Sequence, residues 1–168
     1  MKLIFTAICL ASCAFAGDAG RLAPACGPGA VHFDVKTDTK PQPAAKTEAG
    51  KALVYVIEDI GPAMYPVTGR IGLDGAWVGA NHDDSWFSFS VEPGEHHLCA
   101  DWQPGSTNSN FSPAKLASLA TISAEAGKVY YFRVQMTGSP IVDLEPVNSD
   151  EGQFLIASYP LSTSRPNK

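Results

Sequence analysis

The stretch IGLDGAWVG, residues 71–79, decides the fold of this chain. Its Asp74-Gly75 dipeptide supplies the positive φ angles of a tight hairpin turn, and the residues on either side alternate with a period of two. Two more turn signals, Pro93-Gly94 and Ala126-Gly127, follow between alternating apolar runs before Val134. This succession of turns predicts a β-meander, which indicates the architecture but contains almost no residues that would point to a catalytic or binding site.

The folded body is expected to begin at Lys51. Residues 53–57, Leu-Val-Tyr-Val-Ile, are apolar on both faces, which is typical of a central strand covered on each side. Further strands are predicted at 71–73, 76–78, 86–91, 96–102, 121–125, 128–136 and 141–147. An N-cap candidate and two acids at 149–151 precede an apolar run and favour a helix there. The prediction is an all-β protein, a small antiparallel β-sandwich of about seven to eight strands with a short C-terminal helix.

Four segments are predicted along the chain. Residues 1–16 have the composition of a signal peptide, and residues 17–50 form a lead-in that is Gly/Ala/Pro-rich over 17–30 and has a short edge strand at 31–35. Residues 51–158 form the β-sandwich domain. Residues 159–168 are expected to be a flexible tail that is disordered from Ser162 onward.

The N-terminal segment offers two cleavage sites. Its apolar core, residues 3–10, is too short to span a bilayer and follows a single charge, Lys2, so it is predicted to be a secretory signal. Ala14-Phe15-Ala16 is a small-x-small site. Leu10-Ala11-Ser12-Cys13 resembles a bacterial lipobox and would leave Cys13 lipidated, but the signal peptide would then be unusually short, which favours the first site. Either way the protein is expected to be exported, periplasmic or secreted in the first case and lipid-anchored at Cys13 in the second.

The charge balance excludes some partners. Removal of Lys2 takes the 12 basic residues to 11 against 17 acidic ones, so the formal charge moves from −5 to −6. An acidic chain without a cluster of Lys and Arg is a poor candidate for nucleic acid or anionic lipid. No second apolar run approaches transmembrane length, so we expect membrane attachment only if Cys13 is lipidated.

The cysteines agree with export. Cys9 and Cys13 belong to the signal region, which leaves Cys26 and Cys99 as a pair in an oxidising compartment. We expect a disulfide between them. The alternative, a reactive thiol or a metal ligand, lacks a supporting Cys-x-x-Cys or Cys-His spacing.

Four motifs carry a resemblance to a known family. They are residues 51–56 (KALVYV), 73–79 (LDGAWVG), 93–96 (PGEH) and 125–131 (EAGKVYY). Together they resemble the bacterial exported-protein family called domain of unknown function 2846, over about residues 51 to 147, and more distantly the PEGA-type surface β-domains. The resemblance implies a small β-sandwich found in exported proteins and lipoproteins. It implies no established activity, so no catalytic residues are carried over.

Histidine motifs are the candidates for metal chemistry. His82-Asp83-Asp84 is the strongest, because a turn can bring adjacent carboxylates round one hard cation, yet it lacks the alternating register of a calcium loop and is equally typical of a polar loop. His96 and His97 point to opposite faces of a strand and cannot easily share an ion. We expect His96 to be a core histidine bonded to a backbone carbonyl and His97 to be solvated. No metal or other cofactor is expected.

Aromatic residues are the candidates for binding. Trp77, Trp86 and Tyr131 each fall on the strand face opposite the core-facing run, where exposed rings can stack on sugars or dock a partner. We favour a second interpretation, in which the three rings lie under the N-terminal segment. Cys26 would tether that segment near the strand that carries Cys99.

Two functions from different classes fit these residues. The favoured hypothesis is a non-catalytic exported envelope module that binds a protein, a glycan or a surface component through an aromatic or loop patch. The alternative is a small exported hydrolase with a site in the loop 82–85. The sequence contains no Gly-x-Ser-x-Gly or Ser-x-x-Lys motif and no Gly-rich phosphate loop, so we expect no catalytic residues.

Overall fold

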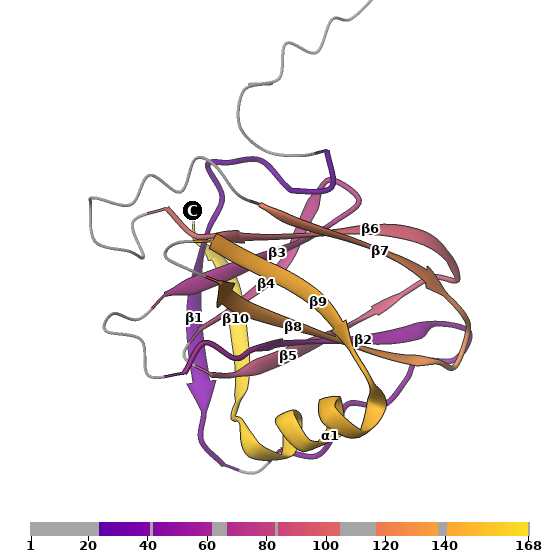
Figure 1. Cartoon of the computed structure of the whole chain (residues 1–168). Coiled ribbons are helices and arrows are strands. Elements are labelled where there is room, and N and C mark those ends of the chain that lie inside the picture. The colour runs from indigo at the N-terminus through magenta and orange to yellow at the C-terminus, as the bar shows by residue number, and fades with distance from the viewer. Residues whose placement is uncertain are drawn as a thin grey trace, which may run out of the picture.

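Two β-sheets packed face to face form the protein in the computed structural model, which describes residues 24–40, 42–61, 67–82, 84–104, 117–137 and 141–167 (Figure 1). The elements in these ranges are β1 (His32–Asp38), β2 (Ala52–Glu58), β3 (Thr68–Leu73), β4 (Ala76–His82), β5 (Trp86–Val91), β6 (Gly94–Trp102), β7 (Ser118–Ala124), β8 (Val129–Thr137), β9 (Ile141–Val147), α1 (Ser149–Ser158) and β10 (Leu161–Asn167). One sheet has the order β1-β10-β5-β2-β8-β9 and the other the order β4-β3-β6-β7. The predicted all-β sandwich is confirmed, with ten described strands instead of about seven to eight. The predicted antiparallel pairing does not hold throughout, because β2 pairs with β8 and β10 with β5 in parallel.

The Asp74-Gly75 dipeptide forms the predicted turn between β3 and β4. Both residues have positive φ angles, 51° at Asp74 and 90° at Gly75, as a primed hairpin turn requires. A register shift between Ile71 and Gly72 places Gly72 opposite Trp77 and Ile71 opposite Gly79. This β-bulge increases the local twist of the hairpin. The N-terminal segment lies against the hairpin at Gly72, next to the bulge.

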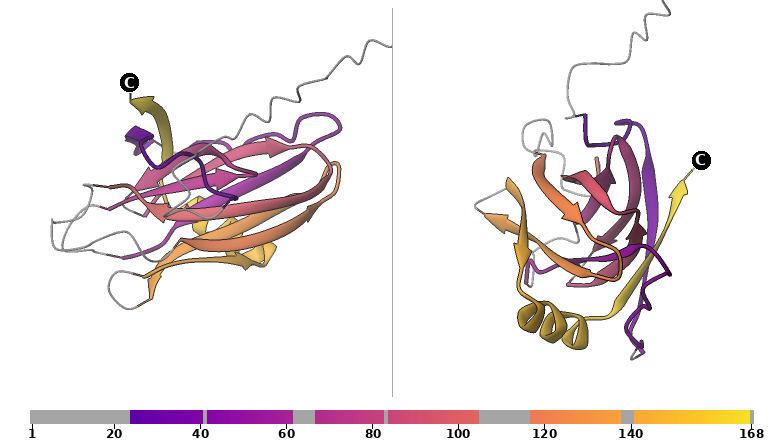
Figure 2. Two further views of the ribbon diagram at one scale, coloured as in Figure 1. Left: turned by 90° about the horizontal axis from the view of Figure 1, so that it is seen from above. Right: turned by 90° about the vertical axis from the view of Figure 1, so that its right-hand side faces the viewer.

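The core lies between the sheets, and β2 runs through its centre. All seven residues of β2 are buried. Val54 and Val56 pack into the cluster between the sheets, whereas Tyr55 and Ile57 point to the opposite face, where helix α1 lies. The predicted central strand covered on each side is therefore confirmed. Figure 2 shows the two layers and the helix beside the larger sheet.

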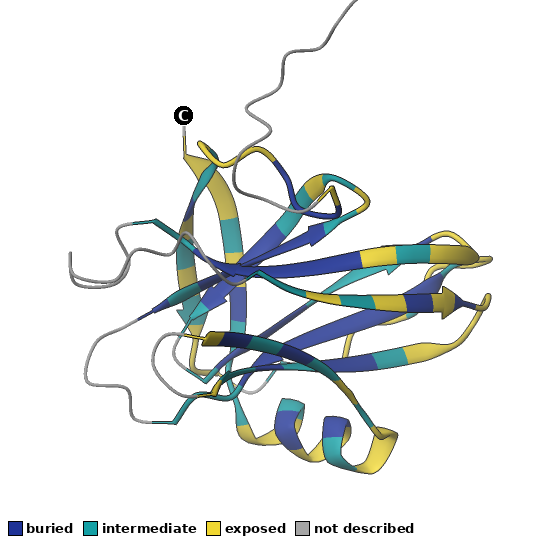
Figure 3. Ribbon diagram, turned by 45° about the horizontal axis from the view of Figure 1, so that its top comes forward, coloured by how far each residue is buried: buried dark blue, intermediate teal, exposed yellow. Residues whose placement is uncertain are grey.

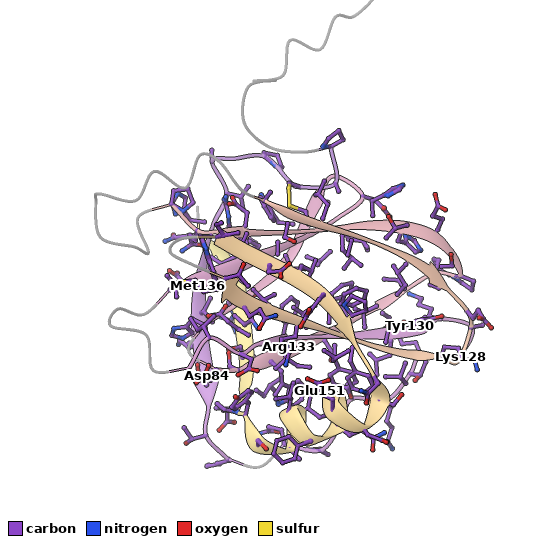
Figure 4. All side chains as sticks on the ribbon, in the orientation of Figure 1. Asp84, Lys128, Tyr130, Arg133, Met136 and Glu151 are labelled. Atoms are coloured by element: carbon purple, nitrogen blue, oxygen red, sulfur yellow. A yellow bond between two sulfur atoms is a disulfide. The ribbon has the colours of Figure 1, made fainter. Side chains whose placement is uncertain are left out.

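Helix α1 packs on the outer face of the six-stranded sheet. Its cap is Asn148, whose side-chain oxygen accepts the Glu151 N–H at 3.0 Å, one residue before the segment predicted from the sequence. The Arg133 guanidinium of strand β8 and the Glu151 carboxylate of the helix point toward one another, and Nη1 donates to the carboxylate at 2.7 Å (Figure 4). Gly152 lies against the ring of Tyr131, which a Cβ atom would strike, so the glycine allows the helix to approach the sheet.

The C-terminal residues form a strand, and the prediction of a flexible tail at 159–168 is wrong. β10 pairs with the whole of β1 in antiparallel register and meets β5 at Leu161 and Trp86. The sequence of β10, LSTSRPN, has no apolar period, so its order comes from backbone pairing with β1 and from the buried hydroxyl of Ser162, 2.7 Å from that of Ser85. The predicted edge strand at 31–35 is confirmed as β1, which begins at His32 and ends at Asp38. The sandwich therefore reaches beyond residues 51–158 on both sides.

The predicted signal peptide, residues 1–16 with Cys13 and both cleavage sites, lies outside the described residues. Within the described ranges, no helix combines the length and the apolar character needed to cross a membrane. Export and lipid attachment therefore stay predictions.

Candidate functional site

A groove of about 590 Å³ opens on the outer face of the four-stranded sheet. Pro24, Ala25 and Asp74 border one side of it, and residues of β6 and β7, including His97, Leu119 and Thr121, border the other. Burial alternates along β7, with Leu119 and Thr121 exposed and Ile122 and Ala124 buried (Figure 3). The lining is mostly apolar, with one carboxylate and one imidazole at its rim.

One side of the groove is a non-strand segment, residues 24–31, that is fastened to the sheet. Cys26 and Cys99 are joined as a disulfide with their Cα atoms 5.2 Å apart, as the sequence predicts. The Gly75 N–H donates to the Ala25 carbonyl at 3.1 Å. A Cβ atom at Gly72 would lie 2.8 Å from that same carbonyl oxygen, so only glycine permits so close an approach of segment and strand.

A buried arginine anchors the other end of the segment. Arg70 is 1% exposed and donates through Nη1 to the carbonyls of Gly29 at 3.1 Å and Val31 at 2.6 Å. Its Nη2 donates to Asp101 at 2.6 Å, and its guanidinium lies 4.3 Å from the centre of the Trp77 ring. Burial raises the pKa of Asp101, and the hydrogen bond and positive charge of Arg70 offset only part of this increase. The segment is therefore fixed by a covalent bond at one end and by charged hydrogen bonds at the other.

At the rim of the groove, Asp74 binds two consecutive histidines. Its Oδ2 lies 2.6 Å from His96 Nδ1, and its Oδ1 accepts the His97 N–H at 2.8 Å. The other ring nitrogen of His96, Nε2, lies 2.8 Å from the Glu92 carbonyl, which can only accept, so Nε2 carries a proton. The bond to Asp74 raises the pKa of His96, although desolvation lowers it.

The Asp74 carboxylate is matched to this positive partner. Desolvation would raise its pKa, but the hydrogen bonds from the His96 ring and the His97 amide together lower it. The predicted bond from His96 to a backbone carbonyl is confirmed, although the side chain is partly buried at the surface instead of in the core. His97 is exposed, as predicted. With both ring nitrogens engaged, His96 holds the turn and is not placed to act as a base.

The three predicted binding aromatics are not brought together. Trp86 and Tyr131 are buried next to helix α1, where Tyr131 stacks on Tyr55 and the Trp86 indole donates to the Tyr159 carbonyl at 2.9 Å. The prediction of an exposed platform is therefore wrong for both, and so is the favoured prediction that they lie under the N-terminal segment. Trp77 alone lies under the N-terminal segment, where its indole donates to the Pro28 carbonyl at 2.8 Å.

The predicted metal candidates are engaged in local structure. His82 Nε2 lies 3.2 Å from the Thr37 hydroxyl of β1. One oxygen of Asp84 accepts the backbone N–H groups of Ile60 and Gly61, both at 2.9 Å, while Asp83 lies outside the described residues. Among the residues that the structure describes, no group of three or more His, Cys, Asp or Glu side chains could hold a metal ion.

Sequence reasoning missed the groove. The predicted strand at 121–125 begins after Leu119, whereas the structure starts it at Ser118 and leaves the Leu119 side chain 56% exposed. The available signal was parity, because an apolar residue on the solvent face of an edge strand breaks the usual alternation. The other side of the groove is formed by Pro24 and Ala25, which are about 90 positions from β7 in the chain. Their segment, residues 24–31, carries no sequence pattern that predicts the contact.

Comparisons with known proteins show no family. No family model matches the chain, and no curated protein matches it. Among solved structures, an NMR structure of a protein from Eubacterium rectale is similar over 64% of this chain and 98% of its own, with 10% identity and a TM-score of 0.35. A similarity of this size carries no argument about function, and the resemblance to domain of unknown function 2846 stays a prediction.

Proposed function

We propose that this protein is a non-catalytic, exported module of the bacterial envelope whose groove binds an extended apolar segment of a partner protein. The observation that carries the proposal is the groove itself, an apolar surface with Asp74 and His97 at its rim. An apolar centre with a polar margin is typical of sites that bind proteins. The disulfide and the Arg70 bonds hold one side of the groove in place, which lowers the entropy lost on binding.

A protein segment fits the groove better than a glycan. Sugar binding usually relies on exposed aromatic faces, and of the three candidate rings two are buried and the third, Trp77, lies under residues 27–28. The groove is lined instead by aliphatic side chains such as Pro24, Ala25 and Leu119. Aliphatic surfaces of this kind contribute to affinity through the area that they bury.

The alternative, a hydrolase with a site at 82–85, draws less support from the contacts of these residues. Asp84 already accepts two backbone N–H groups, and His82 bonds the Thr37 hydroxyl. A base and a nucleophile within hydrogen-bond reach of one another would favour catalysis, and the hydroxyl beside His82 Nε2 is that of Thr37 on β1, which is not a residue of the proposed loop.

Site-specific photocrosslinking in the producing cell tests the binding proposal. A photoreactive residue is placed at His97, in the groove, and for comparison at Phe154, which is 69% exposed on helix α1. We expect an adduct with a different protein from the His97 position and none of that mass from the Phe154 position. The same adduct from both positions, or no heterologous adduct from His97, would contradict the proposal.

Substrate screening tests the alternative. The purified protein and a triple variant, His82, Asp83 and Asp84 all replaced by Ala, are assayed against ester, peptide, glycoside and phosphate substrates. We expect no turnover that depends on the three residues. The triple variant should be less stable by about 1–3 kcal/mol, because two partly buried N–H groups lose the Asp84 carboxylate. Reproducible turnover that disappears in a folded triple variant would favour the hydrolase.

A further inference from the structure

Two of the four edges of the sandwich, those of β4 and β1, are closed by contacts with other parts of the chain, and the edges of β9 and β7 meet each other at Ser118. β4 lies against β10 of the other sheet, and the Ala80 N–H donates to the Ser164 hydroxyl at 3.0 Å. On β1 the Gln103 side chain accepts the Phe33 N–H at 2.7 Å and donates to the Phe33 carbonyl at 3.2 Å. Bonds of this kind occupy the groups that another strand would need.

The edge of β9 is protected by its own sequence. The Leu144 N–H donates to the Ser118 hydroxyl at 3.0 Å, so Leu144 turns its backbone groups away from β8. By alternation Pro146 faces the same way, and proline has no N–H to offer. Asp143 and Glu145 add negative charge on this strand. Charge and proline are the usual devices that prevent strand addition.

The edge of β7 shows neither device. On β6 the His97 N–H donates to the Asp74 carboxylate at 2.8 Å, and the His97 carbonyl accepts the Asp74 N–H at 2.9 Å, so the backbone of His97 faces away from β7. The residues on either side of His97 therefore turn their backbone groups toward β7, where they pair with Ile122 and Ala120. By alternation, Leu119, Thr121 and Ser123 turn their N–H and carbonyl groups to the outside. In the described part of the chain, the hydrogen-bonded strand neighbour of β7 is β6, and β9 of the other sheet lies against its first residue, Ser118, whose hydroxyl accepts the Leu144 N–H.

The sequence of β7, SLATISA, is complementary to itself. It contains no charge and no proline. In an antiparallel pair centred on Thr121, each Leu119 faces Ser123 of the second copy and the two Thr121 residues face each other, so that all outward backbone groups find partners. The Ser123 carbonyl already accepts the Tyr130 hydroxyl at 3.0 Å and keeps a second lone pair. Thr–Thr pairs across a strand pair are favourable, and like charges at these positions would not be.

We propose that two copies of this chain associate through β7, in antiparallel register about Thr121, and join their four-stranded sheets into one. Two chains that each carry a formal charge of −5 repel each other, so they can approach closely only over an uncharged surface such as β7, and the self-complementary sequence of this strand is what identifies the second copy as the occupant. Leu119, half exposed in the single copy, lies on the outer face beside the joint. Leu119 and Thr121 also border the groove, so the dimer carries two grooves on one face. The use of these two grooves for binding rests on the proposed function, whereas the pairing of the two copies does not.

Sedimentation velocity of the purified protein, in the processed form that the producing cell makes, tests the proposal over a wide range of concentration. The wild type is expected to pass from monomer to dimer. Thr121→Lys places two ammonium groups opposite each other and should weaken the dimer about tenfold or more. Thr163→Lys is the matched control, since Thr163 is exposed on β10 and the net charge is the same. It should dimerise like the wild type.

A charge-pairing experiment guards against a folding defect. At a concentration where the wild type is a dimer, Thr121→Lys and Thr121→Glu are each expected to be monomeric and, when mixed, to form a heterodimer, because opposite charges then face each other across the axis. A wild type that stays monomeric at every concentration overturns the proposal, as does a Thr121→Lys variant that dimerises as strongly as the wild type. A partner adduct at His97 with a monomeric wild type would leave the proposed function standing and sink the dimer alone.

Discussion

Replacing both Cys26 and Cys99 by serine is expected to lower the free energy of unfolding by about 4.4 kcal/mol. The bridge joins residues 73 positions apart. Closing a loop of that length costs the unfolded chain about 2.1 + 1.5R ln n cal/mol/K in entropy, which gives this value at 25 °C. In the native state, residues 24–31 would still be held by the Gly75 amide, the Trp77 indole and the Arg70 guanidinium. The loss is therefore expected to stay near the loop-closure value.

The assay is equilibrium unfolding in urea and by heat, on the oxidised wild type and the double variant. For a chain of this length the melting temperature should fall by about 9–18 °C, at roughly 2–4 °C per kcal/mol. Cys26→Ser alone should match the double variant, because losing either sulfur breaks the bridge. Thiol titration of the unfolded, unreduced protein should find neither cysteine free. Equal urea midpoints for the oxidised wild type and the double variant, or two reactive thiols, would refute the reasoning.

Three further variants test the packing. His96→Ala should cost about 1–3 kcal/mol, against little for His97→Ala. The cost should be largest between about pH 3.8 and 6.5. The stabilisation from the raised pKa of His96 is lost as pH rises above this window, and the stabilisation from the lowered pKa of Asp74 is lost as pH falls below it. Urea midpoints measured across pH check this. Asp101→Ala should cost about 3–5 kcal/mol in the same measurement, because it leaves a buried guanidinium unpaired. Gly152→Ala should cost about 1–3 kcal/mol by overpacking, whereas Phe154→Ala, at an exposed site on the same helix, should change the midpoint little.

Local pattern was sufficient for the main elements of the sandwich. The Asp74-Gly75 turn, the doubly buried strand at 52–58 and the Cys26–Cys99 pair all follow from the sequence, because turn geometry, periodicity and redox context act on residues that are close together or few in number. The carbonyl bond of His96 follows for the same reason, since its acceptor, Glu92, lies four positions away.

Contacts between distant segments decided the rest. Side-chain parity showed that Trp86 and Tyr131 leave the main core, but only the docking of helix α1 shows that this second face is also buried. The strand at 161–167 exists because β1 lies beside it, and its own polar sequence carries no period to predict it. The groove likewise needs residues 24–25 to lie against β6 and β7, a meeting that depends on the disulfide and on the Arg70 bonds to main-chain carbonyls, and no local propensity encodes it.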